Sequence, residues 1–445
     1  MKEKPLLKEF LQYTTLNVCG MIGLSCYILA DTFFVSRGLG TNGLTALNLA
    51  IPIYSFVHGS GLMCGIGGAT KYAIYRGQKE YQQANKSFSN TIYIMSVLAI
   101  LFVLMGSAFS KNLTALSGAD DEVFAMTNTY IRIILLFAPA FMANDCLLCF
   151  VRNDGNPRLS MTAMLTGSLS NIILDYLFIF PLHMGIFGAV LATGFAPLIS
   201  LSILSKHFFT KQNQFHFERA KPSLQLTGNI LALGVPSLIT EAASGIVIIV
   251  FNGIFLRLQG NIGVAAYGVV ANLSLVVTSI YTGIAQGTQP LLSRSYGRGD
   301  HKSMKQLLKY AVTAMLTISC LIYLAFILAA DPIVHVFNSE GNSQLQQSAA
   351  AGLKIYFTAV PFVGFNIIIS TFFTSTETAL PAQILSLSRG FAVIIPVVFL
   401  MSYLFKIPGV WLSYPITECL VALAGIICYI FFSKNKMMKE SNVFI

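Results

Sequence analysis

The sequence has few charged residues: Asp, Glu, Lys and Arg make up 10% of its 445 residues, whereas hydrophobic residues make up 55%. A soluble globular protein carries about 25% charged residues, so this chain cannot cover a surface that faces water. Its polar stretches are too short for a sizeable soluble domain. These absences exclude soluble enzymes, disordered proteins and nucleic-acid-binding proteins, and we expect no nucleic-acid partner.

Motifs for several kinds of chemistry are also missing. There is no phosphate-binding P-loop, which excludes direct use of ATP by this chain. The six histidines are scattered without metal-ligand spacing, and the eight cysteines all fall in apolar runs, where free thiols pack as small hydrophobic groups. We therefore expect no disulfide framework, no bound metal cofactor and no organic cofactor.

The hydrophobic residues are gathered in long runs. A membrane helix needs about 20 residues, and twelve runs reach that length: 10–36, 45–73, 89–110, 125–150, 160–180, 186–205, 228–256, 262–290, 307–329, 348–373, 383–404 and 409–432. The sequence predicts an all-α integral membrane protein with twelve transmembrane helices, in contact with the lipid bilayer.

The basic residues predict the orientation of these helices. With both termini in the cytoplasm, the inner segments hold twenty-one Lys and Arg residues, and the outer loops hold four, which are Arg37, Lys111, Arg257 and Lys406. Cytoplasmic loops are enriched in Lys and Arg. We expect a multi-pass protein of the cytoplasmic (plasma) membrane, such as a bacterial inner membrane, with both termini inside.

The chain repeats itself after about half its length. Gly40, Gly43 and Ala46 recur 220 residues later as Gly260, Gly263 and Ala266, and other matches lie at offsets of 221 to 224 residues. Two six-helix halves with the same orientation commonly enclose a substrate site between them. We divide the chain into an N-terminal lobe (1–206), a polar cytoplasmic linker (207–227) and a C-terminal lobe (228–445).

Five acidic residues lie inside predicted membrane helices, where a charge is costly and usually functional. They are Asp31, Asp145, Asp175, Glu241 and Glu418. Tyr27 precedes Asp31 by one helical turn, and Asn171 precedes Asp175 by one turn, so each pair shares a helix face. Two carboxylates that face one cavity would attract cations, either H⁺ or Na⁺.

Other roles for these acids stay open at this point. In one alternative, Asp31 lies at the outer rim and pairs with Arg37. In another, Asp175 is a buried acid that is held by hydrogen bonds and serves packing alone. For Asp145 the simplest interpretation is an ion pair with Arg152 or Arg389.

One stretch of the sequence resembles a known family. The segments GNPRLSM, NIILDYLFIF and MGIFGAVLAT follow one another from residue 155 to 193. Together they are similar to the hallmark region of the MATE (multidrug and toxic compound extrusion) transporters, in particular the bacterial and archaeal multidrug efflux branches. The resemblance implies two pseudo-symmetric six-helix bundles around a central V-shaped cavity.

The resemblance also implies a function and its residues. It implies a secondary active antiporter that exports amphipathic, mostly cationic drugs or metabolites in exchange for H⁺ or Na⁺, acting as a monomer on small organic cations. The cation-coupling residues carried over are Asp31, Asp175, Asn171, Thr193 and Tyr27, and Na⁺ would be held by the first four. The family usually has a proline early in the first helix, but this chain has Leu16 there and Pro236 at the equivalent position of the second half.

Polar residues of the second lobe are candidates for the cavity wall. These are Glu241, Glu418, Gln286, Gln289 and Asn366. The alternative function is a lipid-linked precursor flippase of the same superfamily, which would need a cationic cavity. No Lys or Arg is expected in the middle of a helix, which argues against it.

Overall fold

The computed structural model describes residues 5–219, 221–338 and 341–441, and in these ranges it contains helices joined by short connections and no strand. Side chains are described as far as residue 431. The outermost residues of both termini, expected in the cytoplasm, lie outside the described ranges. All eight cysteines are free, as predicted.

The first half of the chain forms one group of helices. Its membrane-crossing helices are α1 (Leu6–Gly77), α2 (Tyr81–Ala108), α4 (Phe124–Leu136), α5 (Ala138–Asn153), α6 (Pro157–Ile179) and α7 (Gly185–Leu204). The pair α4 and α5 is one span bent by 49°. The short helices α3 (Ser110–Leu116) and α8 (Lys206–Phe209) lie in connections.

The second half repeats this pattern. Its helices are α9 (Leu224–Gly297), α10 (His301–Leu328), α11 (Ala330–Phe337), α12 (Ser343–Tyr356), α13 (Val360–Ser375), α14 (Ala379–Leu387) and α15 (Ile394–Ser441). A short 3₁₀ turn, Phe357–Ala359, joins α12 to α13 in one apolar stretch, and a π-helical turn, Ser388–Ala392, joins α14 to α15.

Three of the helices are each two membrane spans joined at a kink. The break in α1 is at Gly40 (φ 66°, ψ −158°), that in α9 at Gly260 (φ 65°, ψ −153°), and that in α15 at Lys406 (φ 52°, ψ −132°). Glycine adopts this positive-φ conformation without a steric penalty. Counting both arms of these helices, the described residues form twelve spans, which confirms the predicted fold class. The two glycines, 220 residues apart, also share one conformation.

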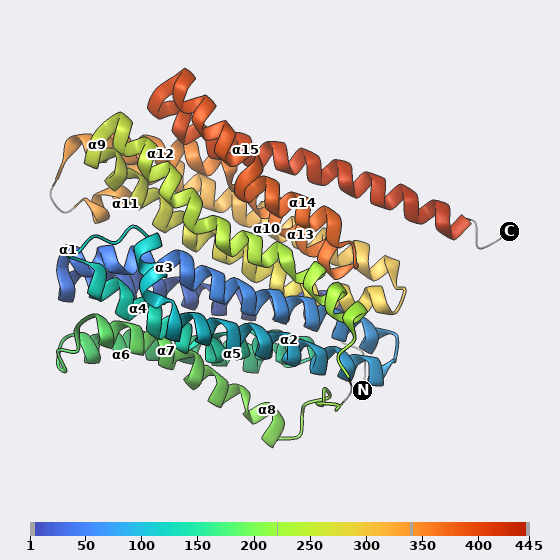
Figure 1. The fold of residues 1–445 in the computed structure, drawn as a ribbon. Coiled ribbons are helices and arrows are strands. Elements are labelled where there is room, and N and C mark those ends of the chain that lie inside the picture. The colour runs from blue at the N-terminus through green and yellow to red at the C-terminus, as the bar shows by residue number, and fades with distance from the viewer. Residues whose placement is uncertain (1–4, 220, 339–340, 442–445) are drawn as a thin grey trace.

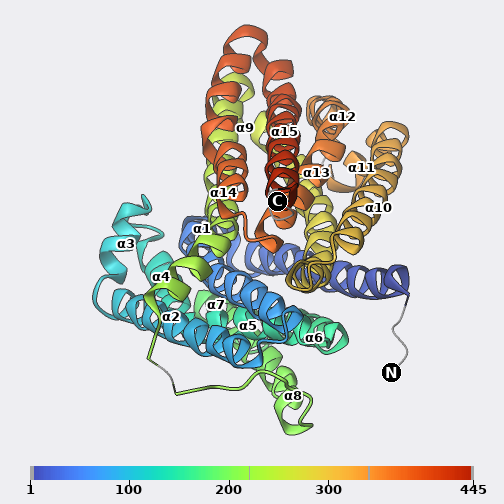
Figure 2. The ribbon, with the colours of Figure 1, turned by 90° about the vertical axis from the view of Figure 1, so that its right-hand side faces the viewer.

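The two groups of helices lie side by side and spread apart at one end. In Figure 1 they are closest at the right, where the segment between α8 and α9 runs, and diverge toward the left, where the kinks of α1, α9 and α15 lie. Figure 2 looks along the molecule from the right-hand end and separates the two groups. We call these ends the linker end (the 210–223 segment) and the hairpin end (Gly40 and Gly260).

At the linker end, α1 and α9 touch backbone to backbone. A Cβ added to Gly67 would lie 2.0 Å from the carbonyl oxygen of Ile230, and one added to Gly234 would lie 1.9 Å from that of Met63. Neither position has room for a methyl group. We call this contact between the two halves the glycine seam.

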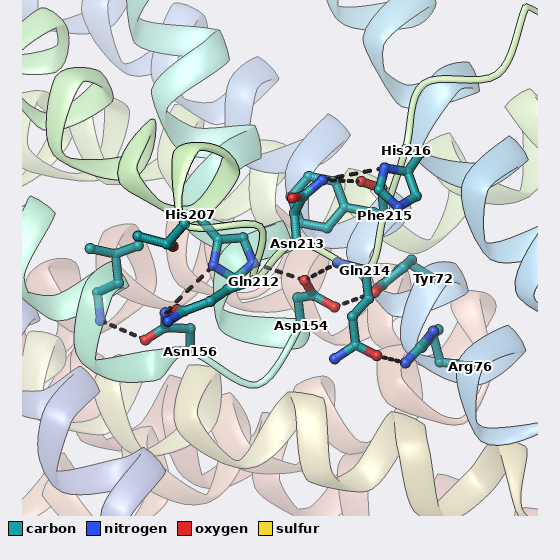
Figure 3. A network of polar contacts seen from close by, with 12 residues as sticks. Tyr72, Arg76, Asp154, Asn156, His207, Gln212, Asn213, Gln214, Phe215 and His216 are labelled. Carbon is teal, nitrogen blue, oxygen red and sulfur yellow. Dashed lines mark hydrogen bonds and ion pairs between the residues drawn. The ribbon is translucent and has the colours of Figure 1, made fainter.

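The segment between the halves is docked on the first half, as Figure 3 shows. The carboxylate of Asp154 accepts hydrogen bonds from the Tyr72 hydroxyl, from the backbone N–H of Gln214 (2.8 Å) and from His207 Nε2 (2.8 Å). Phe215 is fully buried against the rings of Phe88 and Phe150. Although polar in composition, this linker is therefore a fixed part of the linker end.

Candidate functional site

The five residues expected to couple a cation come together inside the first half, where α1, α6 and α7 pack. Asp31 and Asp175 are within side-chain hydrogen-bonding reach of each other. The amide of Asn171 satisfies both of its neighbours when its nitrogen donates to Asp175 Oδ2 (3.0 Å) and its oxygen accepts from the backbone N–H of Thr193 (3.2 Å). Tyr27 interacts electrostatically with both carboxylates. We call this set the acid-pair cluster.

The two carboxylates are buried without a cationic partner among the described residues. Asp31 is 8% exposed and Asp175 is fully buried. Oδ1 of each has no hydrogen-bond partner in the described part of the chain. Arg37, the suggested partner of Asp31, instead lies over the ring of Phe33. Two adjacent carboxylates cannot both stay ionised in such surroundings, so the acid-pair cluster is built to take up a proton or another cation.

Two tyrosines that the sequence did not single out extend the cluster. Tyr130, on α4, makes a side-chain hydrogen bond with Thr193 and interacts electrostatically with Asp31. Tyr54, on the second arm of α1, pairs its hydroxyl with that of Tyr27 at 3.0 Å. Both are polar only at the ring tip, so a hydropathy pattern treats them as ordinary interior aromatics.

A separate cavity of about 320 Å³ lies mainly in the second half. All five predicted cavity residues line it: Glu241, Glu418, Gln286, Gln289 and Asn366. Its first-half lining consists of Leu62, Ile66 and Arg152. The acid pair was expected to face a shared cavity, but neither Asp31 nor Asp175 lines this one, because both point into the packed interior of the first half.

Glu418 is held by several neighbours in the cavity wall. Arg389 Nε contacts both of its carboxylate oxygens (2.7 and 2.9 Å), Asn366 Nδ2 donates to Oε2 (2.7 Å), and Tyr414 makes side-chain hydrogen bonds with both charged groups. Arg389 reaches this position from the π-helical turn, Ser388–Ala392. Such turns often occur at functional sites, and sequence periodicity does not reveal them.

Arg152, in the last turn of α5, also lines the cavity. It is 2% exposed, and its Nη1 donates to Asn17 Oδ1 (2.9 Å) and to Gln286 Oε1 (2.7 Å). Next to it, Asn153 Nδ2 donates to Gln289 Oε1 (3.0 Å). Gln286 and Gln289 therefore join the two halves besides facing the cavity.

Asp145 pairs with His58, which corrects the expected pairing with Arg152 or Arg389. The distance from His58 Nδ1 to Asp145 Oδ2 is 2.9 Å. The missing Cβ of Gly61 makes room for the carboxylate, since a methyl group there would lie 2.6 Å from Asp145 Oδ2. The scattered histidines show no metal-ligand spacing, and spacing alone does not reveal a buried pair with an acid. A better signal was a titratable ring inside an apolar run, next to a stretch rich in glycine.

Comparisons with known proteins agree with this architecture. The sequence model of the MatE family matches residues 18–177 and 236–400. The multidrug export protein MepA of Staphylococcus aureus (strain MSSA476) is 26% identical over 428 residues, covering 96% of this chain and 94% of that protein. MepA of Staphylococcus haemolyticus (strain JCSC1435) is 26% identical over 432 residues, with the same coverage.

Two solved structures have the same fold. One is an outward-facing conformation of a multidrug resistance MATE family transporter of the MOP superfamily, with a TM-score of 0.91, 21% identity, and coverage of 98% of this chain and 97% of that chain. The other is a MOP superfamily transporter from Pyrococcus furiosus, for which a reverse polarity of the binding pocket suggests a different function. It has a TM-score of 0.88, 22% identity, and coverage of 95% of both chains.

Proposed function

The chain belongs to the MATE family of membrane transporters, and from this premise we propose that it is a secondary antiporter that exports amphipathic, mostly cationic compounds in exchange for an inward-moving cation. It is a multi-pass transporter and not an enzyme. The coupling ion, the substrate class and the orientation in the membrane are part of this proposal.

One observation carries the proposal: Asp31 and Asp175 face each other in the interior of the first half with no basic side chain beside them among the described residues. An unpaired intramembrane carboxylate is expensive to keep. A pair that shares one site binds a cation readily and loses it when the surroundings change. That is the property which a coupling site needs.

The arrangement favours H⁺ over Na⁺ as the coupling ion. A sodium ion needs oxygen atoms pointed at it, but Asn171 presents its N–H to Asp175 and its oxygen to Thr193 N, while the Thr193 hydroxyl donates to the Ala189 carbonyl. A proton needs only the two carboxylates. Its uptake would remove their repulsion and change how α1 and α6 pack.

The cavity supports an organic cation as substrate. Both staphylococcal relatives are named multidrug export proteins. The cavity here carries the carboxylate of Glu241 and the rings of Tyr267, Tyr356 and Tyr414, whose faces attract cations. Its remaining lining is largely aliphatic or hydroxylated, which suits an amphipathic compound held without strict shape requirements.

The flippase alternative is not favoured, although the cavity contains two arginines. The charge of Arg389 is balanced by Glu418 at 2.7 Å, so it does not give the cavity a free positive charge. Glu241 contributes a carboxylate with no basic partner other than His58 in the described residues. The second arginine, Arg152, is hydrogen-bonded to the neutral side chains of Asn17 and Gln286, and its charge is offset by that of Glu241. The cavity therefore lacks the excess of positive charge that a phosphate-bearing lipid precursor would need.

The lobe boundaries (1–206, 207–227 and 228–445), the plasma-membrane location and the monomeric state are part of the same proposal. With both termini in the cytoplasm, the linker end faces the cytoplasm and the hairpin end faces outward. The contacts of the glycine seam then close the cytoplasmic side, and the spreading lobes open the cavity outward.

The test is transport by purified protein in liposomes, with H⁺ and Na⁺ gradients imposed separately. We expect efflux of ethidium driven by a pH gradient, and at least a tenfold loss of that efflux in Asp31→Asn and in Asp175→Asn, because each variant removes one member of the proton-binding pair. The measurement is dye fluorescence after the gradient is imposed.

The control is Asp121→Asn, which neutralises an exposed acid in a loop and is expected to transport like the parent. Undiminished efflux and undiminished H⁺ coupling in Asp175→Asn would refute the coupling role. Efflux driven only by a Na⁺ gradient would refute the choice of H⁺.

A further inference from the structure

Between the acid-pair cluster and the cavity lies a second group of ionisable side chains, His58, Asp145 and Glu241, which come from α1, α5 and α9. His58 Nδ1 donates to Asp145 Oδ2 at 2.9 Å, and both residues interact electrostatically with Glu241. A Cβ placed on Gly59 would lie 3.0 Å from the Glu241 Cβ, so the second half approaches the first directly beside His58. We call these three residues the bridging cluster.

The bridging cluster is enclosed on the first-half side and open on the other. The side chain of His58 is 17% exposed and that of Asp145 is 6% exposed, whereas Glu241 lines the cavity. Other titratable groups near His58 or Asp145 are Tyr54 and Tyr27 on α1 and Cys146 and Cys149 on α5. None of these is basic, but Arg152 contacts Cys149 and lines the same cavity as Glu241. Among the described residues, His58 is the basic side chain that contacts Asp145.

We propose that His58, held by Asp145, is a second proton-binding residue whose proton competes with the cationic substrate for Glu241. This rests on the proposed antiport of an organic cation. It differs from the acid pair in both place and effect, because its proton acts directly on the substrate site.

The charges explain the competition. With both carboxylates ionised, the bridging cluster has a net charge of minus one when His58 is protonated and minus two when it is neutral. The charge of an imidazole changes readily near neutral pH, and a neighbouring carboxylate moves this change to higher pH. A proton on His58 therefore weakens the attraction of Glu241 for an organic cation, and loss of that proton strengthens it.

Contacts on α1 link this cluster to the acid pair. The rings of Tyr54 and His58 stack in parallel with their centroids 5.9 Å apart, and the Tyr54 hydroxyl contacts that of Tyr27 at 3.0 Å. Tyr27 in turn interacts electrostatically with Asp31 and Asp175. A change of packing at the acid pair thus reaches His58 through two side chains, which couples the two proton-binding places.

The experiment measures equilibrium binding of tetraphenylphosphonium to the full chain in nanodiscs, between pH 6 and pH 10. This cation carries no proton, so any pH dependence comes from the protein. Binding is measured in the Asp31→Asn/Asp175→Asn background, where the acid pair no longer titrates. We expect affinity to rise about tenfold from pH 6 to pH 10, and this rise to fall below twofold when His58→Gln is added.

Three further variants test the proposal. Asp145→Asn, added to the same background, should also reduce the pH dependence, and Glu241→Gln should weaken binding at every pH. His335→Gln, which removes an exposed histidine of α11, should leave the dependence unchanged. If affinity in the background does not vary with pH, or still varies tenfold after His58→Gln, the proposal is overturned. Because binding is scored without the acid pair, these results stand apart from the transport test.

Discussion

Arg389 and Glu418 show what a single pair of residues does in the cavity wall. Glu418 is 1% exposed and makes its charged contacts with Arg389 and Asn366. Removing one member of a buried ion pair leaves an uncompensated charge and costs about 3 to 5 kcal/mol, whereas removing both is often nearly neutral. The pair therefore contributes little net stability, although the loss of either member alone is costly.

We expect Arg389→Gln to lower the stability of the protein by about 3 kcal/mol, and Arg389→Gln/Glu418→Gln to recover most of the loss. Thermal unfolding of the purified variants in detergent measures both effects. The control is Lys354→Gln, which removes an exposed pairing with Asp331 at 3.9 Å and should change nothing. A double variant no more stable than the single one would contradict this account.

For single residues, the sequence predicted the members of the acid-pair cluster but not the contacts that hold each side chain. Asp31, Asp175, Asn171 and Thr193 were found because a polar group inside an apolar run is conspicuous and the resemblance to the MATE family linked them. The partner of Asp145 was missed because contacts between distant helices leave no trace in local spacing. Arg389 was suggested as a partner of Asp145 and instead pairs with Glu418, since a π-helical turn shifts side-chain direction without changing composition.

At the scale of elements, the linker is the segment in which structure departs most from composition. Its polar sequence predicted a plain connector, yet Phe215 is buried and Asp154 receives three hydrogen bonds from its surroundings. Hydropathy misled here because the buried ring of Phe215 and the contacts with Asp154, at the end of α5, fix a segment that is polar overall. The twelve spans, in contrast, were predictable, since every run was long enough to cross a bilayer.

We expect Phe215→Ala to release the linker, because truncating a buried Phe costs about 3 to 5 kcal/mol and the loss falls on this docked segment. Limited trypsin digestion at Arg219 should become at least tenfold faster, as followed by fragment appearance on gels. His216→Ala, which truncates the exposed neighbouring ring, is the control and should be cut at the parent rate. Equal rates in Phe215→Ala and the parent would show that Phe215 does not hold the segment.

At the scale of the whole molecule, two ion pairs join the halves at the linker end. Lys71 of α1 pairs with Glu377, which follows α13, and Arg294 of α9 pairs with Glu9 of α1 at 2.7 Å. Both pairs lie at the same end of the molecule as the glycine seam. In the proposed antiport cycle, they would have to separate for this end to open.

We expect Glu377→Gln to shift the population toward molecules open at the linker end by about fivefold, since a partly exposed pair is worth about 1 kcal/mol. Spin labels on Lys79→Cys and Lys302→Cys report the separation of the halves by electron–electron dipolar spectroscopy. Exchanging the charges, Lys71→Glu with Glu377→Lys, should restore the parent distances. Asp331→Asn, a change at an exposed pair within the second half, should not alter them.

Gly67 meets the Ile230 carbonyl and Gly234 meets the Met63 carbonyl with no side chain between them. At these two contacts no rotamer has to be fixed when the helices meet, so little side-chain entropy is lost there. A methyl group added at either glycine would collide with the facing carbonyl oxygen and act as a spacer between the two halves at this end.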